Sequence, residues 1–126
     1  MTALIDQITA PLVERNMPFA ATFGNHDMSK TCSTRVMSEY MRDNIEGKNG
    51  KKLSFTTSAV SGPYEQLGSS NYYIPVYASS GGGNPQLSLM LYFFDSRGGR
   101  DFQKVDANGK DMPIDGWVDD KVSPQP

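Results

Sequence analysis

Residues 18–27 read PFAATFGNHD, and this stretch decides the fold class. Its first part, PFAATF, is almost wholly apolar, which is typical of a strand that is covered on both faces of a sheet. Such strands belong to sheets with crossover helices, so the run predicts an α/β protein. The run stops at Gly24, and Asn25, His26 and Asp27 follow at once. An amide, an imidazole and a carboxylate therefore lie together at a strand end, where α/β proteins usually bind their ligands.

Helical patterns flank this strand on both sides. Apolar residues recur at helical spacing before it, so residues 2 to about 15 predict an amphipathic helix that is bent or interrupted at Pro11. After the loop, Ser33 or Thr34 can cap a second helix, which ends in the basic, glycine-bearing loop DNIEGKNGKK. We interpret the methionines of its apolar stripe as core packing. That stripe consists of Val36, Met37, Tyr40 and Met41.

The second half of the chain has a different pattern. NYYIPVYA (71–78) and LSLMLYFF (87–94) are strand-like runs separated by SSGGGNPQ, and together they predict an antiparallel hairpin. Pro75 places its strand at an edge or next to a bulge. The residues from Asp95 onward are rich in Gly, Asp and Pro and predict a long loop, with a possible turn at Asn108 and Gly109. The expected order is therefore helix, strand, helix and antiparallel hairpin.

Composition excludes several classes of partner. The 126 residues, 37% hydrophobic and 21% charged, are typical of one globular domain or part of one. Lys and Arg number 12 against 14 for Asp and Glu, so no basic surplus suits nucleic acid. No apolar run is long enough to span a membrane, and MTALIDQITA lacks the basic start of a signal peptide. We expect neither a nucleic acid nor a membrane as partner; the compartment is not encoded, and cytoplasm is the default.

The cysteine content also limits the possible chemistry. Cys32 is the only cysteine, so the chain has no internal disulfide. Its polar neighbours, SKTCST, favour an ordinary cysteine in a loop or just before a helix over a catalytic nucleophile.

The four residues after the apolar run have complementary chemistry. Gly24 can adopt the positive φ of a tight turn and lets a ligand approach the backbone. Asn25 offers a neutral oxygen to a divalent cation. His26 can transfer a proton near neutral pH or bind a phosphoryl oxygen, and Asp27 can fix the tautomer of the imidazole ring.

The string PFAATFGNHD resembles the third metal-site block of the calcineurin-like metallophosphoesterases. The wider context is similar to the fungal and plant branch of purple-acid-phosphatase-like proteins, through PFAATFGNHDMS, STRVMSEYM, SNYYIPV, LSLMLYFFDS and DGWV. The resemblance implies that residues 1–126 are a partial calcineurin-like phosphoesterase domain, truncated at both ends. The fold implied is the central fragment of a four-layer α/β/β/α sandwich.

The resemblance also implies an activity. In this family two metal ions (Fe, Zn or Mn) clamp a phosphate ester and activate water for its hydrolysis. Asn25 would be a metal ligand, His26 would contact the phosphate and assist the leaving group, and Asp27 would orient His26. The substrate would be a small phosphate monoester or a phosphoprotein.

The chain also departs from the family. The family needs Asp-x-His and Gly-Asp blocks upstream, and a separate His and a Gly-His-x-His block downstream, whereas His26 is the only histidine here. We therefore expect a central piece of a phosphoesterase that is inactive alone and binds no metal tightly. The alternatives are a non-enzymatic, phosphatase-like interaction or regulatory module, and an unrelated small α/β protein whose loop happens to contain the motif.

Overall fold

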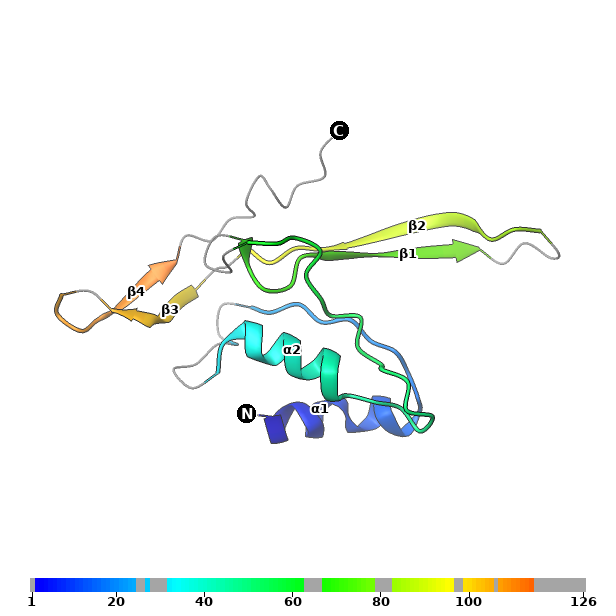
Figure 1. Cartoon of the computed structure of the whole chain (residues 1–126), viewed down its shortest axis with the longest axis horizontal. Helices are drawn as coiled ribbons and strands as arrows, with labels where there is room; N and C mark the ends of the chain where they lie inside the picture. The colour runs from blue at the N-terminus through cyan, green and yellow to red at the C-terminus, as the bar shows by residue number, and fades with distance from the viewer. Residues whose placement is uncertain are drawn as a thin grey trace.

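The computed structural model describes residues 2–24, 27, 32–62, 67–78, 83–96, 99–105 and 107–114. Two helices come first in the chain, followed by two β-hairpins (Figure 1). The elements are α1 (Thr2–Glu14), α2 (Thr34–Asn44), β1 (Tyr72–Ala78), β2 (Gln86–Phe93), β3 (Gly99–Val105) and β4 (Asp111–Ile114). Mixed helices and antiparallel strands make this a small α/β structure, in agreement with the predicted class.

The core lies where the two helices meet the loops around them. Ile5 of α1 and Met37 of α2 are buried together with Cys32, Ile45 and Leu53. Burial of Met37 confirms that a methionine of the α2 stripe packs in the core. Cys32 is buried and lies directly before Ser33, the N-cap of α2, so its predicted position just before a helix is confirmed.

The ends of the helices follow from single residues. Ser33 is the N-cap of α2, and its side chain accepts a hydrogen bond from the N–H of Val36 at 3.3 Å. Of the two predicted caps, Ser33 is therefore the one used. The helix α1 continues through Pro11 to Glu14, so of the predicted bend or interruption at Pro11 the interruption does not occur. Proline removes one main-chain hydrogen bond, and the other bonds of the helix maintain it.

The stretch 18–23 is extended, but it forms only one step of a parallel ladder. The N–H of Phe19 donates to the carbonyl oxygen of Leu53 at 2.9 Å, and the N–H of Phe55 donates to the carbonyl oxygen of Phe19 at 2.8 Å. Because α2 lies between the paired segments in sequence, the connection has the order of a βαβ crossover. Phe19 and Phe23 are only half-buried, so the prediction of a strand covered on both faces is not met by the described residues.

The predicted hairpin is confirmed as β1 and β2. The two strands pair antiparallel from Tyr72 opposite Phe93 to Ala78 opposite Gln86, and a bulge lies between Val76 and Tyr77. The sheet has only these two strands among the described residues, so Pro75 lies on an edge strand. Figure 1 shows that much of the hairpin extends beyond the two helices.

A second hairpin corrects the prediction of a long loop after Asp95. β3 and β4 pair antiparallel, with Gly99 opposite Ile114, around a turn in which Gly109 has a φ of 77°. The turn expected at Asn108 and Gly109 is therefore confirmed. The strands were missed because GRDFQKV and DMPI show no apolar alternation, and a local turn can set the register of a hairpin without it.

Among the residues described here, no helix is both long and apolar enough to cross a membrane.

Candidate functional site

The turn that follows the extended segment 18–23 is closed by Asp27. The main-chain N–H of Gly24 donates a hydrogen bond to Asp27 Oδ2 at 2.5 Å, and the N–H of Asp27 donates to the carbonyl oxygen of Gly24 at 3.2 Å. These bonds join the two sides of the loop that contains Asn25 and His26, and both of those residues lie outside the described residues. The roles of Asn25 and His26 therefore stay predictions, and Asp27 has a visible role in shaping the loop.

Gly24 does not use the conformational freedom that we expected of it. Positive φ angles occur at several other glycines of the described chain but not at Gly24. A Cβ atom on Gly24 would lie 3.5 Å from Asp27 Oδ2, which is an ordinary van der Waals contact. The expectation of a positive φ is wrong because the Asp27 carboxylate closes the turn through a local side-chain hydrogen bond.

Ala21, three residues before Gly24, is anchored by two side chains from distant parts of the sequence. Its N–H donates to Thr56 Oγ1 at 3.0 Å, and its carbonyl oxygen accepts from the Tyr72 hydroxyl at 2.7 Å. Thr56 has an exposed fraction of 0% and Tyr72 one of 5%. Hydrogen bonds in such a water-poor setting are electrostatically stronger than in water. The segment that leads into the candidate loop is therefore held through both main-chain polar groups of Ala21.

Tyr72 also connects the candidate loop to the β1–β2 hairpin. Its ring stacks on that of Phe93, with ring centroids 4.6 Å apart and an interplanar angle of 4°. Burial raises the pKa of the Tyr72 hydroxyl. The hydroxyl is consequently protonated at neutral pH and able to donate its hydrogen bond.

Asp95 is a buried structural carboxylate. Its Oδ2 accepts a hydrogen bond from the N–H of Ser69 at 2.7 Å. The hydroxyl oxygen of Ser69 lies 3.1 Å from the same Asp95 oxygen and 2.7 Å from Thr34 Oγ1, at the start of α2. These contacts join Asp95, the second residue after β2, to the loop before β1 and to the first residue of α2. The buried contacts of Asp95 are those of a structural anchor.

The loop around Asp95 is closely fitted to it. The N–H of Asp95 donates to Asn71 Oδ1 at 2.8 Å, and Asn71 Nδ2 donates to the carbonyl oxygen of Leu67. Gly68 has a φ of 75°, and a Cβ there would lie 2.7 Å from Asp95 Cγ. A side chain at position 68 would therefore be strained and would also collide with the carboxyl group.

A polar hollow of about 310 Å³ lies beside α2 and includes Arg35 and Arg42 in its lining. Arg35 Nε lies 2.9 Å from Glu39 Oε1, and the Arg42 guanidinium makes two contacts of 2.8 Å with the Asp43 carboxylate. The hydrogen bond between Arg42 and Asp43 raises the pKa of Arg42 and lowers that of Asp43. An anion would have to compete with these carboxylates, so the hollow does not favour a phosphate.

The donor set of this chain does not by itself fit a dinuclear metal centre. His26 is the only histidine in the sequence, and the part of the chain that the structure describes has no group of three or more His, Cys, Asp or Glu side chains placed to hold a metal ion. A dinuclear site requires more N and O ligands than the one amide of Asn25. Ligands from another polypeptide segment would be needed.

No family model, curated protein or solved structure matches this chain. Its function is therefore inferred from its own residues.

Proposed function

We propose that this chain is the central part of a metal-dependent phosphoesterase, with the four-layer sandwich of the calcineurin-like family, and that it is inactive alone. The observation that carries the proposal is the Gly-Asn-His-Asp string at the end of an extended segment that pairs in parallel across α2. Ligand sites of α/β folds lie at such strand ends. The closed turn between Gly24 and Asp27 supports it further, because a functional loop needs a rigid base.

Each residue of the loop has a distinct proposed task. Asn25 provides a neutral oxygen ligand, and His26 donates a proton to the leaving oxygen and binds the phosphoryl group. Asp27 holds the loop through Gly24 and orients the His26 ring. Metal ions, when bound, supply Lewis-acid activation of water and of the phosphoryl group. The substrate class is a phosphate monoester.

Nuclear magnetic resonance can test the assignment of Asn25 on the full chain. Mn²⁺ is added to isotope-labelled protein, and paramagnetic broadening of side-chain signals is measured. Because the chain alone lacks the other ligands, binding will be weak, and we expect the Asn25 amide and the single imidazole of His26 to broaden together as Mn²⁺ is raised. We expect Asn25→Ala to abolish the broadening of His26. The matched control is Asn49→Ala, because Asn49 is an exposed asparagine in the loop after α2.

Two outcomes would contradict the proposal. One is broadening of other side chains that leaves Asn25 and His26 unchanged at every Mn²⁺ concentration tested. The other is broadening of His26 that persists in Asn25→Ala, which would show that the metal ion reaches the loop without the amide oxygen.

A second candidate function is a non-enzymatic interaction module, and one observation favours it. The β1–β2 hairpin exposes large apolar side chains along its length, among them Val76, Leu87 and Leu89, with exposed fractions of 39%, 55% and 53%. Apolar surface of this kind marks interaction sites. Two results together would favour this module over the phosphoesterase. Mn²⁺ would not broaden the signals of Asn25 and His26, and the β1–β2 hairpin would bind a partner protein stably.

A further inference from the structure

The two outer edges of the β1–β2 hairpin differ in what they can pair with. Antiparallel strands exchange two N–H···O bonds at every second residue pair, and Pro75, which lies opposite Met90, has no N–H to donate. This pair is therefore of the kind without mutual hydrogen bonds, in which the main-chain groups of both residues point away from the partner strand. The outer edge of β1 thus lacks a donor at Pro75, whereas the outer edge of β2 has both main-chain groups of Met90. Tyr92 lies two residues along β2, so its main-chain groups point outward as well.

The outer edge of β2 has none of the features that usually block pairing with another chain. Natural edge strands are protected by charged residues, by proline or by a bulge. Neither β1 nor β2 contains a charged residue. The register shifts between Val76 and Tyr77, which makes Ser88 the extra residue of the bulge. Residues 89–93 therefore form a stretch without charge, proline or bulge, and no third strand pairs with it in the part of the chain that the structure describes.

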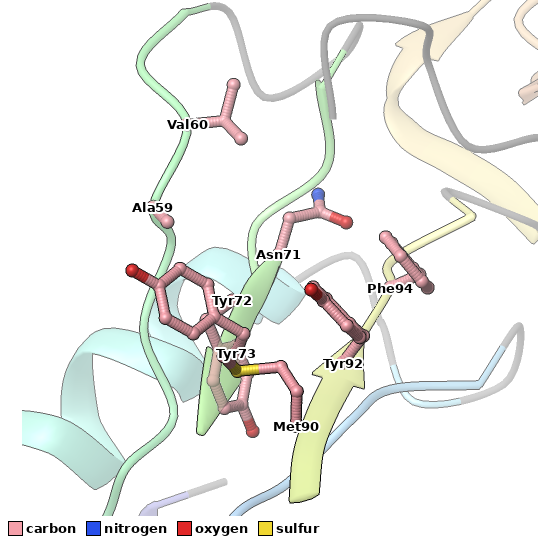
Figure 2. A pocket seen from close by; sticks show the side chains of 8 residues that line it. All are labelled: Ala59, Val60, Asn71, Tyr72, Tyr73, Met90, Tyr92 and Phe94. Carbon is pink, nitrogen blue, oxygen red and sulfur yellow. The ribbon is translucent and has the colours of Figure 1, made fainter. Parts of the chain in front are cut away.

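The side chains of residues 89–93 are apolar on both faces of the hairpin. Figure 2 shows Met90 and Tyr92 on the same face as Tyr73 of β1, where they line an apolar hollow of about 320 Å³. Leu89 and Leu91 alternate with them and belong to the opposite face, with exposed fractions of 53% and 40%. Edge strands usually carry polar or charged side chains on an exposed face. The composition of β2 is instead that of a strand inside a larger sheet.

We propose that residues 89–93 pair antiparallel with the same residues of a second copy of this chain, so that two hairpins join in one four-stranded sheet. A two-fold axis that relates two copies of this stretch passes beside its central residue, Leu91. Met90 then lies opposite Tyr92 of the second copy. These are the two residues whose main-chain groups point outward, so each such pair exchanges hydrogen bonds. The pairing brings no like charges together, and it does not depend on the phosphoesterase assignment.

The available surface indicates a weak and reversible dimer. Leu89, Leu91, Tyr92 and Phe94 have exposed fractions of 53%, 40%, 51% and 42%. At about 150–200 Å² for each side chain, they offer about 300–400 Å² from each copy and about 600–800 Å² in a dimer. Stable interfaces bury about 1,200 Å² or more, so this dimer belongs to the weak class. In strand addition the main-chain hydrogen bonds contribute much of the affinity. We therefore expect dimers that form at micromolar concentrations and dissociate on dilution.

Sedimentation equilibrium of the full chain tests the proposal. The wild type should change reversibly from a monomer to a species of twice the mass as its concentration is raised. Leu91→Lys places two like charges directly opposite each other at the axis, so it should raise the dissociation constant several-fold. Val76→Lys is the matched control, because Val76 is 39% exposed on the same face but lies on β1. It should leave the dissociation constant within a factor of about two of the wild type.

A cysteine at the axis gives a second measurement that needs no new charge. Opposite residues without mutual hydrogen bonds have Cα atoms about 4.5 Å apart, which is within the range of a disulfide. Air oxidation should therefore join Leu91→Cys chains in covalent dimers, as two thiols lose two protons and two electrons to oxygen. Val76→Cys should form such dimers several-fold more slowly. The wild type gives the baseline, because Cys32 is buried.

Three results would overturn the proposal. The first is a wild type that stays monomeric at every concentration. The second is an equal effect of the two lysine variants, or equal rates of cross-linking of the two cysteine variants. The third is a dimer or larger species that persists unchanged in Leu91→Lys, because the chain would then associate through another surface.

Discussion

Removing the hydroxyl of Tyr72 should loosen the segment that leads into the candidate loop. In Tyr72→Phe the carbonyl oxygen of Ala21 loses a donor at 2.7 Å, while the ring can keep its stacking on Phe93. Loss of such a hydrogen bond costs about 1–1.5 kcal/mol. If the segment opens locally, the protection of the Phe19 and Phe55 amides against hydrogen exchange should fall by a factor of about 5–13, because 1.4 kcal/mol corresponds to a tenfold change in the opening equilibrium.

Native-state amide hydrogen exchange measures this effect residue by residue. Tyr73→Phe is the matched control, because Tyr73 is the next residue in β1 and is 55% exposed where Tyr72 is 5% exposed. Its exchange rates should stay within a factor of about two of the wild type, as for a surface substitution. Equal effects of the two variants on Phe19 and Phe55 would refute the assignment of Tyr72 as the anchor.

The same variant predicts a dependence on pH. Burial raises the pKa of Tyr72 in the folded chain, so its contribution to stability is fully present below its unfolded pKa of about 10. That contribution is lost as the pH rises through the folded pKa, because the unfolded chain ionises first. In urea unfolding, the stability difference between wild type and Tyr72→Phe should therefore shrink above a pH of about 10. A difference that grows with alkaline pH would contradict the burial argument.

Three further predictions concern the chain and the intact phosphoesterase of which we propose it is a part. The purified chain should show no turnover of an aryl phosphate with Mn, Zn or Fe supplied in turn, and metal-dependent turnover abolished by His26→Ala would contradict this. The chain should bind a hydrophobic dye and self-associate through the exposed side chains of the β1–β2 hairpin. Leu87→Lys should reduce dye fluorescence and light scattering, and a wild-type monomer that binds no dye would contradict the prediction. In the intact phosphoesterase that we propose, Asn25→Ala should lower the amount of bound metal. His26→Ala should leave the metal content near normal and lower turnover by about a hundredfold or more, with a smaller loss for aryl esters than for alkyl esters. Equal metal loss in both variants would show that the assignment of His26 is wrong.

Much of the fold could be predicted because its signals are local. Helical spacing and a capping serine mark α2, and a glycine-rich turn between two apolar runs marks the β1–β2 hairpin. The pair β3 and β4 was missed because its strands lack apolar alternation, although the turn at Asn108 and Gly109 was visible. Hairpins of this kind depend on turn geometry and main-chain pairing, which a pattern of apolar residues does not report.

The contacts that support the candidate site could not be predicted, because they join residues that are far apart in the sequence. The Gly-Asn-His-Asp string is visible in the sequence, but the groups that hold the preceding segment are not. Thr56 and Tyr72 reach Ala21 from 35 and 51 residues away. Threonine and tyrosine are common in strands for other reasons, so their residue types do not identify these contacts. Only the three-dimensional arrangement shows that both main-chain polar groups of Ala21, just before the loop, are held by distant side chains.

Sequencing the full-length transcript on both sides of these 126 codons tests the central claim most directly. If Asn25 and His26 belong to a dinuclear phosphoesterase site, the same reading frame should encode Asp-x-His and Gly-Asp blocks before Met1 and a Gly-His-x-His block after Pro126. A transcript that encodes none of these blocks on either side would contradict the phosphoesterase assignment, because the remaining metal ligands would then have no source in the protein.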